Sequence, residues 1–178
     1  IILKALGVVP VEIPATLATR YQPTPELLEE AGRLDGLIVA SPSNPTGTML
    51  GHAELKALAD YCTHKGIRLV SDEIYHGIEY DKKAVTALEV TDDCYVINSF
   101  SKYFSMTGWR IGWLVLPDDL RRPAECLAQN FFISPPAPSR VSASSRKTRL
   151  SAHQRESWIS RHRCLANSTT ACSSTAAT

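Results

Sequence analysis

The sequence predicts an α/β domain in which a mostly parallel sheet lies between helices, as a three-layer α/β/α arrangement. Short apolar runs rich in Val, Ile and Leu alternate along the chain with segments in which apolar residues recur at helical spacing. Several of these runs are nearly continuous, which is typical of buried strands in a parallel sheet. With 178 residues, of which 44% are hydrophobic and 21% charged, the chain is long enough for one domain with a core.

Five segments have the composition of strands, namely residues 8–13, 36–40, 67–71, 94–98 and 111–116. The first is predicted to be an edge strand, because Pro10 has no N–H to donate to a neighbouring strand. The last is ended by Pro117. The other three are bounded by turn residues and predict the centre of the sheet.

Three helices are predicted from apolar spacing and from signals at their ends. Thr24 is the expected N-cap of the first, which has Pro25 in its first turn and runs to about Arg33. The second covers residues 52–64 and is closed by Gly66. The third begins at a pair of aspartates, residues 118–119, and runs to about residue 130.

Charge divides the chain into two unlike segments. Residues 1–139 carry 12 basic and 17 acidic side chains, a net charge of −5, whereas residues 140–178 carry 7 basic side chains and one acid, a net charge of +6. The second segment is rich in Ser, Arg, Thr and Ala and has no sustained periodicity. We therefore predict a folded domain over residues 1–137 and a basic, disordered tail over residues 138–178.

Two further expectations concern this tail. The abrupt change after Ala137 leads to the hypothesis that the tail is an out-of-frame translation. No nucleic-acid partner is predicted, because runs of charge are usually solvated.

The cysteines indicate the compartment. Cys62, Cys94, Cys126, Cys164 and Cys172 are odd in number, scattered and without C-x-x-C spacing, so neither a disulfide framework nor a metal site is predicted. This pattern fits a reducing compartment, and we predict a cytoplasmic protein. No apolar run is long enough to span a bilayer, and the first residues do not resemble a signal peptide, so no membrane partner is expected.

Polar side chains follow three predicted strands at the point where each strand ends. Asn44 follows residues 36–40, Asp72 follows residues 67–71, and Ser99 follows residues 94–98. Ligands of open α/β sheets collect at the carboxyl ends of strands, so these groups are expected to converge. Taken singly, each has an ordinary explanation, such as a turn for Asn44 or a helix cap for Asp72.

Two basic residues after the third of these strands add a chemical indication. Lys102 can act as a nucleophilic amine toward a carbonyl cofactor. Arg110, eight residues later, can hold a phosphate with several donors in a fixed geometry. The pair predicts a site for a phosphorylated carbonyl compound, although most lysines are simply solvated surface residues.

Three motifs carry these groups: Ser43-Asn44-Pro45-Thr46-Gly47, Ser71-Asp72-Glu73-Ile74-Tyr75, and Ser99-Phe100-Ser101-Lys102 followed by Gly108-Trp109-Arg110. In order and spacing they resemble the class I and II aminotransferases, which are fold-type I enzymes dependent on pyridoxal 5′-phosphate (PLP). The resemblance covers about residues 1–137 and implies the central part of the PLP-binding large domain.

The resemblance implies roles for the residues around the cofactor ring. Lys102 forms a Schiff base with PLP and afterwards moves the α-proton of the substrate. Asp72 keeps the pyridine nitrogen protonated, which makes the ring an electron sink. Tyr75 and Asn44 hydrogen-bond the 3′-oxygen of the ring and stabilise its ionised form.

The resemblance also implies how the phosphate is held. Ser99, Ser101 and Arg110 are its expected ligands, and Gly108 is expected to keep the backbone close. The peptide bond between Asn44 and Pro45 is expected to be cis.

The activity implied by the resemblance is transfer of an amino group from an amino acid to a 2-oxo acid, within amino acid metabolism, by a homodimer in full-length members. Two alternatives stay open: another fold-type I PLP enzyme, a lyase or synthase, and a non-enzymatic chain, either an inactive truncated fragment or part of a regulator that senses PLP. The motifs do not separate these alternatives, because they serve to activate Cα of an amino acid in each enzyme. They also leave the substrate unidentified.

Overall fold

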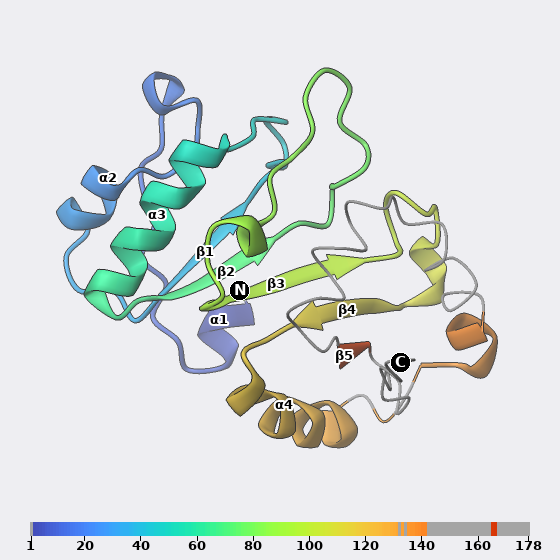
Figure 1. Cartoon of the computed structure of the whole chain (residues 1–178). Helices are drawn as coiled ribbons and strands as arrows, with labels where there is room; N and C mark the ends of the chain where they lie inside the picture. The colour runs from blue at the N-terminus through green and yellow to red at the C-terminus, as the bar shows by residue number, and fades with distance from the viewer. Residues whose placement is uncertain (1, 132, 134, 142–164, 167–178) are drawn as a thin grey trace, which may run out of the picture.

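In the described part of the chain, the strands form one mixed sheet in the order β1-β2-β3-β4-β5 (Figure 1). The computed structural model describes residues 2–131, 133, 135–141 and 165–166. The strands are β1 (Gly36–Ala40), β2 (Arg68–Asp72), β3 (Cys94–Ser99), β4 (Gly112–Val115) and the very short β5 (Leu165–Ala166). Strands β1, β2 and β3 run parallel, β4 is antiparallel to β3, and β5 is antiparallel to β4. The predicted α/β class is confirmed.

Helices lie on both sides of the strands in Figure 1, where α2 (Pro25–Glu30) and α3 (His52–Lys65) appear above the sheet and α4 (Asp118–Phe131) below it. The remaining named helices are α1 (Ile2–Ala5) and the 3₁₀ turns η1 (Leu17–Thr19), η2 (Ala87–Glu89) and η3 (Thr107–Trp109). None of the helices in the described ranges is long and apolar enough to cross a membrane.

The helix ends follow from the capping residues. The Thr24 hydroxyl accepts a hydrogen bond from the backbone N–H of Leu27, as predicted for an N-cap. Gly66 has a φ of 69° and closes α3 in the left-handed conformation that glycine adopts without strain. Helix α2 ends at Glu30, earlier than predicted, because the chain turns at Gly32, whose φ is 78°.

The core lies between α3 and one face of the sheet. Side chains alternate between the two faces of each strand, and the members that face α3 are buried. On the strands these are Leu37, Val39, Leu69, Ser71, Cys94, Val96, Trp113 and Val115, and on α3 they are Leu55, Leu58, Ala59 and Cys62. Burial of this apolar surface is the main force that fixes α3 on the sheet.

The opposite face of the sheet is only partly covered by the described residues. Ile38 on β1 and Ile97 on β3 are 57% and 41% exposed. The expectation of strands buried on both faces is therefore wrong for the described chain, because α4, on the far side of the strands, contributes no buried residue. Asp72 shares this face with Ile97, its neighbour in the register of β2 and β3.

Residues 8–13 are irregular, so the predicted edge strand is wrong. No described strand runs beside them, Pro10 lacks a donor, and Val9 is 83% exposed. Residues 111–116 do supply β4, but it is antiparallel to its neighbour. The connection from β3 consists of turns and η3, with no helix to carry a parallel crossover.

The predicted disordered tail, residues 138–178, falls mostly outside the described residues. Residues 137–141 are helical and residues 165–166 form β5. The hypothesis of an out-of-frame translation also concerns this segment and stays a hypothesis.

Candidate active site

The carboxyl ends of β1, β2 and β3 lie side by side at one edge of the sheet. Ala40 on β1 is in register with Asp72 on β2, which is in register with Ile97 on β3. Asn44 follows β1 in the next loop, Asp72 ends β2 and Ser99 ends β3. The polar residues that end these strands therefore meet at the edge where ligands of α/β sheets bind.

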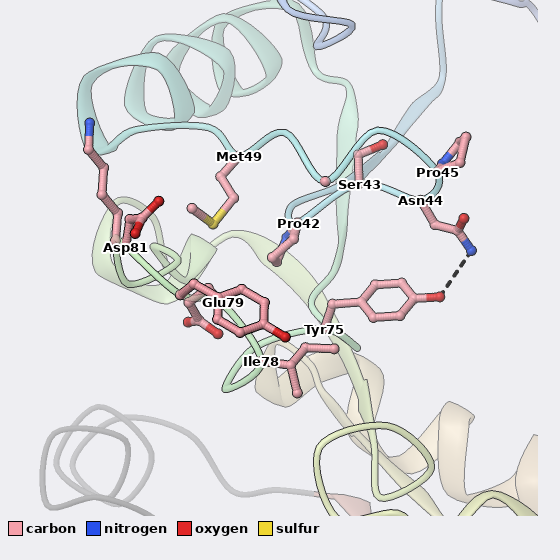
Figure 2. Close-up of a pocket in the computed structure, with 12 residues that line it drawn as sticks. Pro42, Ser43, Asn44, Pro45, Met49, Tyr75, Ile78, Glu79 and Asp81 are labelled. Atoms are coloured by element: carbon pink, nitrogen blue, oxygen red, sulfur yellow. Dashed lines mark hydrogen bonds between the residues drawn. The ribbon is translucent and has the colours of Figure 1, made fainter.

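Asn44 and Tyr75 form the first side of the site, shown in Figure 2. Asn44 Nδ2 donates a hydrogen bond of 3.0 Å to Tyr75 Oη. Because the tyrosine oxygen is the acceptor, its own hydrogen stays available to donate to a ligand, as does the second N–H of Asn44. Both residues line a cavity of about 580 Å³. We call this pair the Asn44–Tyr75 side.

The loop that carries Asn44 is tightly turned. The N–H of Gly47 donates to the carbonyl of Ser43 at 2.8 Å, and the N–H of Ser43 donates to the carbonyl of Thr48 at 3.0 Å. The peptide bond between Asn44 and Pro45 is cis, as predicted. The bond between Ser41 and Pro42 is also cis, which the sequence did not indicate.

Lys102 and Arg110 form the second side of the site with Ser99 and Ser101, and we call this set the Lys102–Arg110 side. All four line one cavity of about 360 Å³. Lys102 Nζ lies 5.7 Å from the centre of the Tyr75 ring, so the two sides adjoin. Both basic side chains are exposed, and neither forms an ion pair within the described ranges.

The two serines are linked to each other and to the backbone. Ser99 Oγ donates to the carbonyl of Ile111 at 3.1 Å and accepts from the N–H of Ser101 at 3.0 Å. The two hydroxyl oxygens are 2.8 Å apart. These contacts fix Ser99 in the wall of the cavity and use its hydroxyl hydrogen, so that Ser101 has the hydroxyl that is free to donate to an anion there.

Arg110 is placed by the turn between β3 and β4. It has a φ of 50°, and its guanidinium donates to the carbonyl of Thr107 at 3.3 Å. The role expected of Gly108 concerns the phosphate and stays a prediction, since a Cβ there would meet no protein atom within 4 Å. A close approach within the protein occurs at Gly112, where a Cβ would lie 2.7 Å from the carbonyl oxygen of Asn98 and would force β3 and β4 apart.

Asp72 is half-buried and lies beside the second cavity. Its Oδ1 accepts a hydrogen bond of 3.1 Å from the N–H of Ile74, a residue that lines the cavity with Lys102. This contact uses one carboxylate oxygen and leaves Oδ2 for a cationic or N–H ligand. Asp72 itself lines neither cavity.

Two residues behind the site were not singled out from the sequence. Glu73 and His76 have side chains that are only 5% and 10% exposed, and Glu73 Oε2 lies 3.6 Å from His76 Nδ1. Burial raises the pKa of the Glu73 carboxyl above its usual range. The alternation of side chains along a strand could have indicated that Glu73 is buried. Leu69, Ser71 and Glu73 are every second residue, so they point to the same, buried face of the sheet.

Comparison with known proteins places this architecture in a family. The sequence model described as "Aminotransferase class I and II" matches residues 1–174. A valine–pyruvate aminotransferase of Mycobacterium tuberculosis is 49% identical over 147 residues, which is 81% of this chain and 38% of the relative. An aspartate aminotransferase of Geobacillus stearothermophilus is 38% identical over 75% of this chain and 36% of its own length.

Solved structures agree with these sequence matches. An aminotransferase from Mycobacterium tuberculosis superposes with a TM-score of 0.78 at 49% identity, over 82% of this chain and 40% of its own. The Thermus thermophilus aspartate aminotransferase crystallised with maleate also has a TM-score of 0.78, at 28% identity over 89% of this chain and 42% of its own.

The fold is a mixed α/β sheet, and two basic residues, Lys102 and Arg110, line a cavity near the carboxyl end of β3. The chain belongs to the class I and II aminotransferase family. It spans about two fifths of the length of the relatives it matches.

Proposed function

We propose that this chain is the central part of the large domain of a PLP-dependent aminotransferase. The observation that carries the proposal is the shared cavity of Lys102, Arg110, Ser99 and Ser101, which adjoins the hydrogen-bonded pair Asn44 and Tyr75. A phosphorylated aldehyde would need three kinds of group for binding: an amine to react with its carbonyl carbon, a cation to hold its phosphate, and hydrogen-bond donors to orient it.

The residues present fit each part of PLP. Arg110 suits the phosphate, because the guanidinium has no acidic partner in the described ranges. The hydroxyls of Ser99 and Ser101 line the same cavity, and Ser99 would donate to the phosphate by turning away from the Ile111 carbonyl. Tyr75 Oη and Asn44 Nδ2 suit the 3′-oxygen, since each keeps a hydrogen to donate. Asp72 Oδ2 suits the ring nitrogen.

When bound, PLP supplies an aldehyde that reacts with amines and a protonated ring that withdraws electrons from the substrate. Lys102 Nζ is the residue that attaches the cofactor and then accepts and returns a proton at the α-carbon of the substrate. Asp72 holds the proton on the ring nitrogen, and Asn44 and Tyr75 orient the ring. Arg110 and Ser99 fix the phosphate, so that the reacting carbon stays in reach of Lys102.

Amino-group transfer is favoured over a lyase or synthase reaction by the relatives named above, which are aminotransferases. We propose an amino acid and a 2-oxo acid as substrates, a homodimer for the full-length protein and a cytoplasmic location. The location is supported by Cys62, Cys94 and Cys126, which are free thiols in the described structure. The valine and pyruvate named for one relative indicate a first pair of substrates to test.

A titration of the purified chain with PLP tests this proposal. We expect an absorbance band of a lysine-bound cofactor to appear with the wild-type chain and to be absent with Lys102→Ala. Lys65→Ala is the matched control, because this lysine is exposed on α3 and pairs with Glu29. A band that persists in Lys102→Ala, or that never forms in the wild type at saturating PLP, would contradict the proposed role of Lys102.

A further inference from the structure

A buried acid and a buried histidine connect the two loops that carry Tyr75 and Asn44. His76 follows Tyr75 in the turn after β2, and its Nε2 lies 2.9 Å from the carbonyl oxygen of Ser41. Ser41 begins the loop that carries Asn44. On the other side of the imidazole ring, Nδ1 faces Glu73 Oε2 at 3.6 Å.

The hydrogen-bonding partners determine where the protons lie. A carbonyl oxygen can only accept, so Nε2 of His76 carries the hydrogen in its contact with Ser41. A neutral imidazole then presents a lone pair at Nδ1 to Glu73 Oε2, which would be repulsive if the carboxylate were ionised. The 3.6 Å between these two atoms makes their contact electrostatic, because it is longer than a hydrogen bond.

Glu73 is held firmly on its other oxygen. Oε1 accepts from the hydroxyl of Ser71 at 3.1 Å, from the hydroxyl of Thr86 at 3.0 Å and from the N–H of Ala87 at 2.8 Å. These bonds orient the carboxyl group, so that Oε2 faces the imidazole ring. The pair is therefore anchored to β2 and to η2 at the same time.

Ser41, the first residue of the loop that carries Asn44, is also held by hydrogen bonds. Ser41 Oγ accepts from the N–H of Leu50 at 2.9 Å, and the N–H of Ser41 donates to the carbonyl of Asp72 at 3.3 Å. The contact from His76 adds a side-chain link between this base and the turn that carries Tyr75. Asn44 lies three residues after Ser41, Tyr75 directly precedes His76, and the two are hydrogen-bonded to each other at 3.0 Å.

We propose that Glu73 and His76 are positioning residues: Glu73 faces the imidazole ring, and His76, through the Ser41 carbonyl, holds the Asn44 loop against Tyr75. They touch neither cavity and act on the cofactor site only through the Asn44–Tyr75 side. The consequence for cofactor affinity rests on the proposed function, whereas the hydrogen-bond arrangement does not.

Three substitutions separate the contacts of this pair. His76→Gln places an amide N–H where Nε2 was and keeps the donation to Ser41, whereas His76→Ala removes it. Glu73→Gln removes the charge of the acid, while its carbonyl can accept the three bonds of Oε1 and its amide nitrogen faces His76 Nδ1. His64→Gln is the matched control, because His64 is exposed on α3.

The first measurement uses nitrogen and proton magnetic resonance of the full chain without cofactor. We expect His76 to carry a slowly exchanging proton on Nε2 and the Asn44 side-chain amide to have one fixed environment. Both the Asn44 and Tyr75 signals should change in His76→Ala and stay in place in His76→Gln and Glu73→Gln. Unchanged Asn44 signals in a folded His76→Ala chain would overturn the proposal, as would large changes in Glu73→Gln.

The second measurement is the affinity of the same variants for PLP. His76→Ala should bind about tenfold more weakly, and His76→Gln, Glu73→Gln and His64→Gln within about twofold of the wild type. Equal affinity of His76→Ala and the wild type would contradict the positioning role and leave the proposed function intact. If the wild type binds no PLP, the proposed function fails, while the resonance measurement still decides the role of the pair.

Discussion

The Asn44–Tyr75 side of the candidate site is held by side-chain hydrogen bonds, whereas the Lys102–Arg110 side presents two cations that no described acid neutralises. The first side rests on buried groups, because Glu73 and His76 lie directly behind it. On the second side Lys102 and Arg110 are exposed, and the Thr107 hydroxyl and the Arg110 guanidinium donate to backbone carbonyls around η3.

This difference separates two tasks within one site. Hydrogen-bond donors that neighbouring groups already hold in place can bind and orient a neutral or partly charged oxygen of a ligand. Little further conformational entropy is lost when the ligand binds. Cations without an acidic partner attract an anion and are stabilised by it, so that their contribution depends on ionic strength. We therefore expect the two sides to respond differently to mutation and to salt.

The largest effect is expected on the Lys102–Arg110 side. Arg110→Ala should weaken PLP binding by about 2 kcal/mol, which is about 30-fold in affinity, because a charge-assisted phosphate contact is lost. The salt dependence of binding should also become shallower. Arg33→Ala is the control, since its side chain is 92% exposed on the far loop. Titrations at two salt concentrations measure both quantities, and an unaltered salt dependence would argue against a phosphate contact.

A smaller effect is expected on the Asn44–Tyr75 side. Tyr75→Phe removes one hydroxyl and should weaken PLP binding by about 1 kcal/mol, or about fivefold, with the salt dependence of the wild type. The same titrations are compared with Tyr21→Phe, because Tyr21 is 47% exposed and lines neither cavity. If Tyr75→Phe altered the salt dependence as strongly as Arg110→Ala, the distinction between the two sides would be wrong.

The smallest effect near neutral pH concerns Cys94, a buried thiol at the start of β3. Burial, followed by the nearby charges of Glu73, Asp93 and Asp92, raises its pKa from 9.0 to about 12. Between these values the unfolded chain loses a proton that the folded chain keeps, so the free energy of unfolding decreases as pH rises above about 9. Below that range the contribution is fully present.

Unfolding by denaturant, followed from pH 7 to pH 11, checks this behaviour. Cys94→Ala should unfold with a weaker pH dependence above pH 9, and Cys126→Ala, at a half-buried position on α4, should behave like the wild type. A wild-type chain whose stability does not change above pH 9 would mean that Cys94 is accessible to water in the folded protein.

The sequence predicted the parts of the fold that depend on local patterns. The runs 36–40, 67–71 and 94–98 became β1, β2 and β3 within one residue at each end, and the caps at Thr24 and Gly66 were placed as expected. It failed for residues 8–13, because a strand needs a partner that composition does not reveal. The direction of β4 was also not indicated, since it depends on the path of the turn before it.

For the candidate site, the sequence indicated side chains that meet in space. Asn44 and Tyr75 are hydrogen-bonded, and Lys102, Ser99, Ser101 and Arg110 share one cavity. Their roles stay predictions. The pair Glu73 and His76 was missed, because a histidine becomes informative only when its two nitrogens are seen between a carbonyl and a carboxyl group. Gly112 was missed for a similar reason, since its close contact with Asn98 exists only in the paired strands.

The central claim is that Lys102 is the amine that attaches PLP. Reduction of the PLP-treated chain with borohydride, followed by mass spectrometry of its peptides, tests this claim most directly. We expect one cofactor adduct, on Lys102, which is lost in Lys102→Ala and strongly reduced in Arg110→Ala. Adducts spread over exposed lysines such as Lys56 and Lys65, with no preference for Lys102, would contradict it.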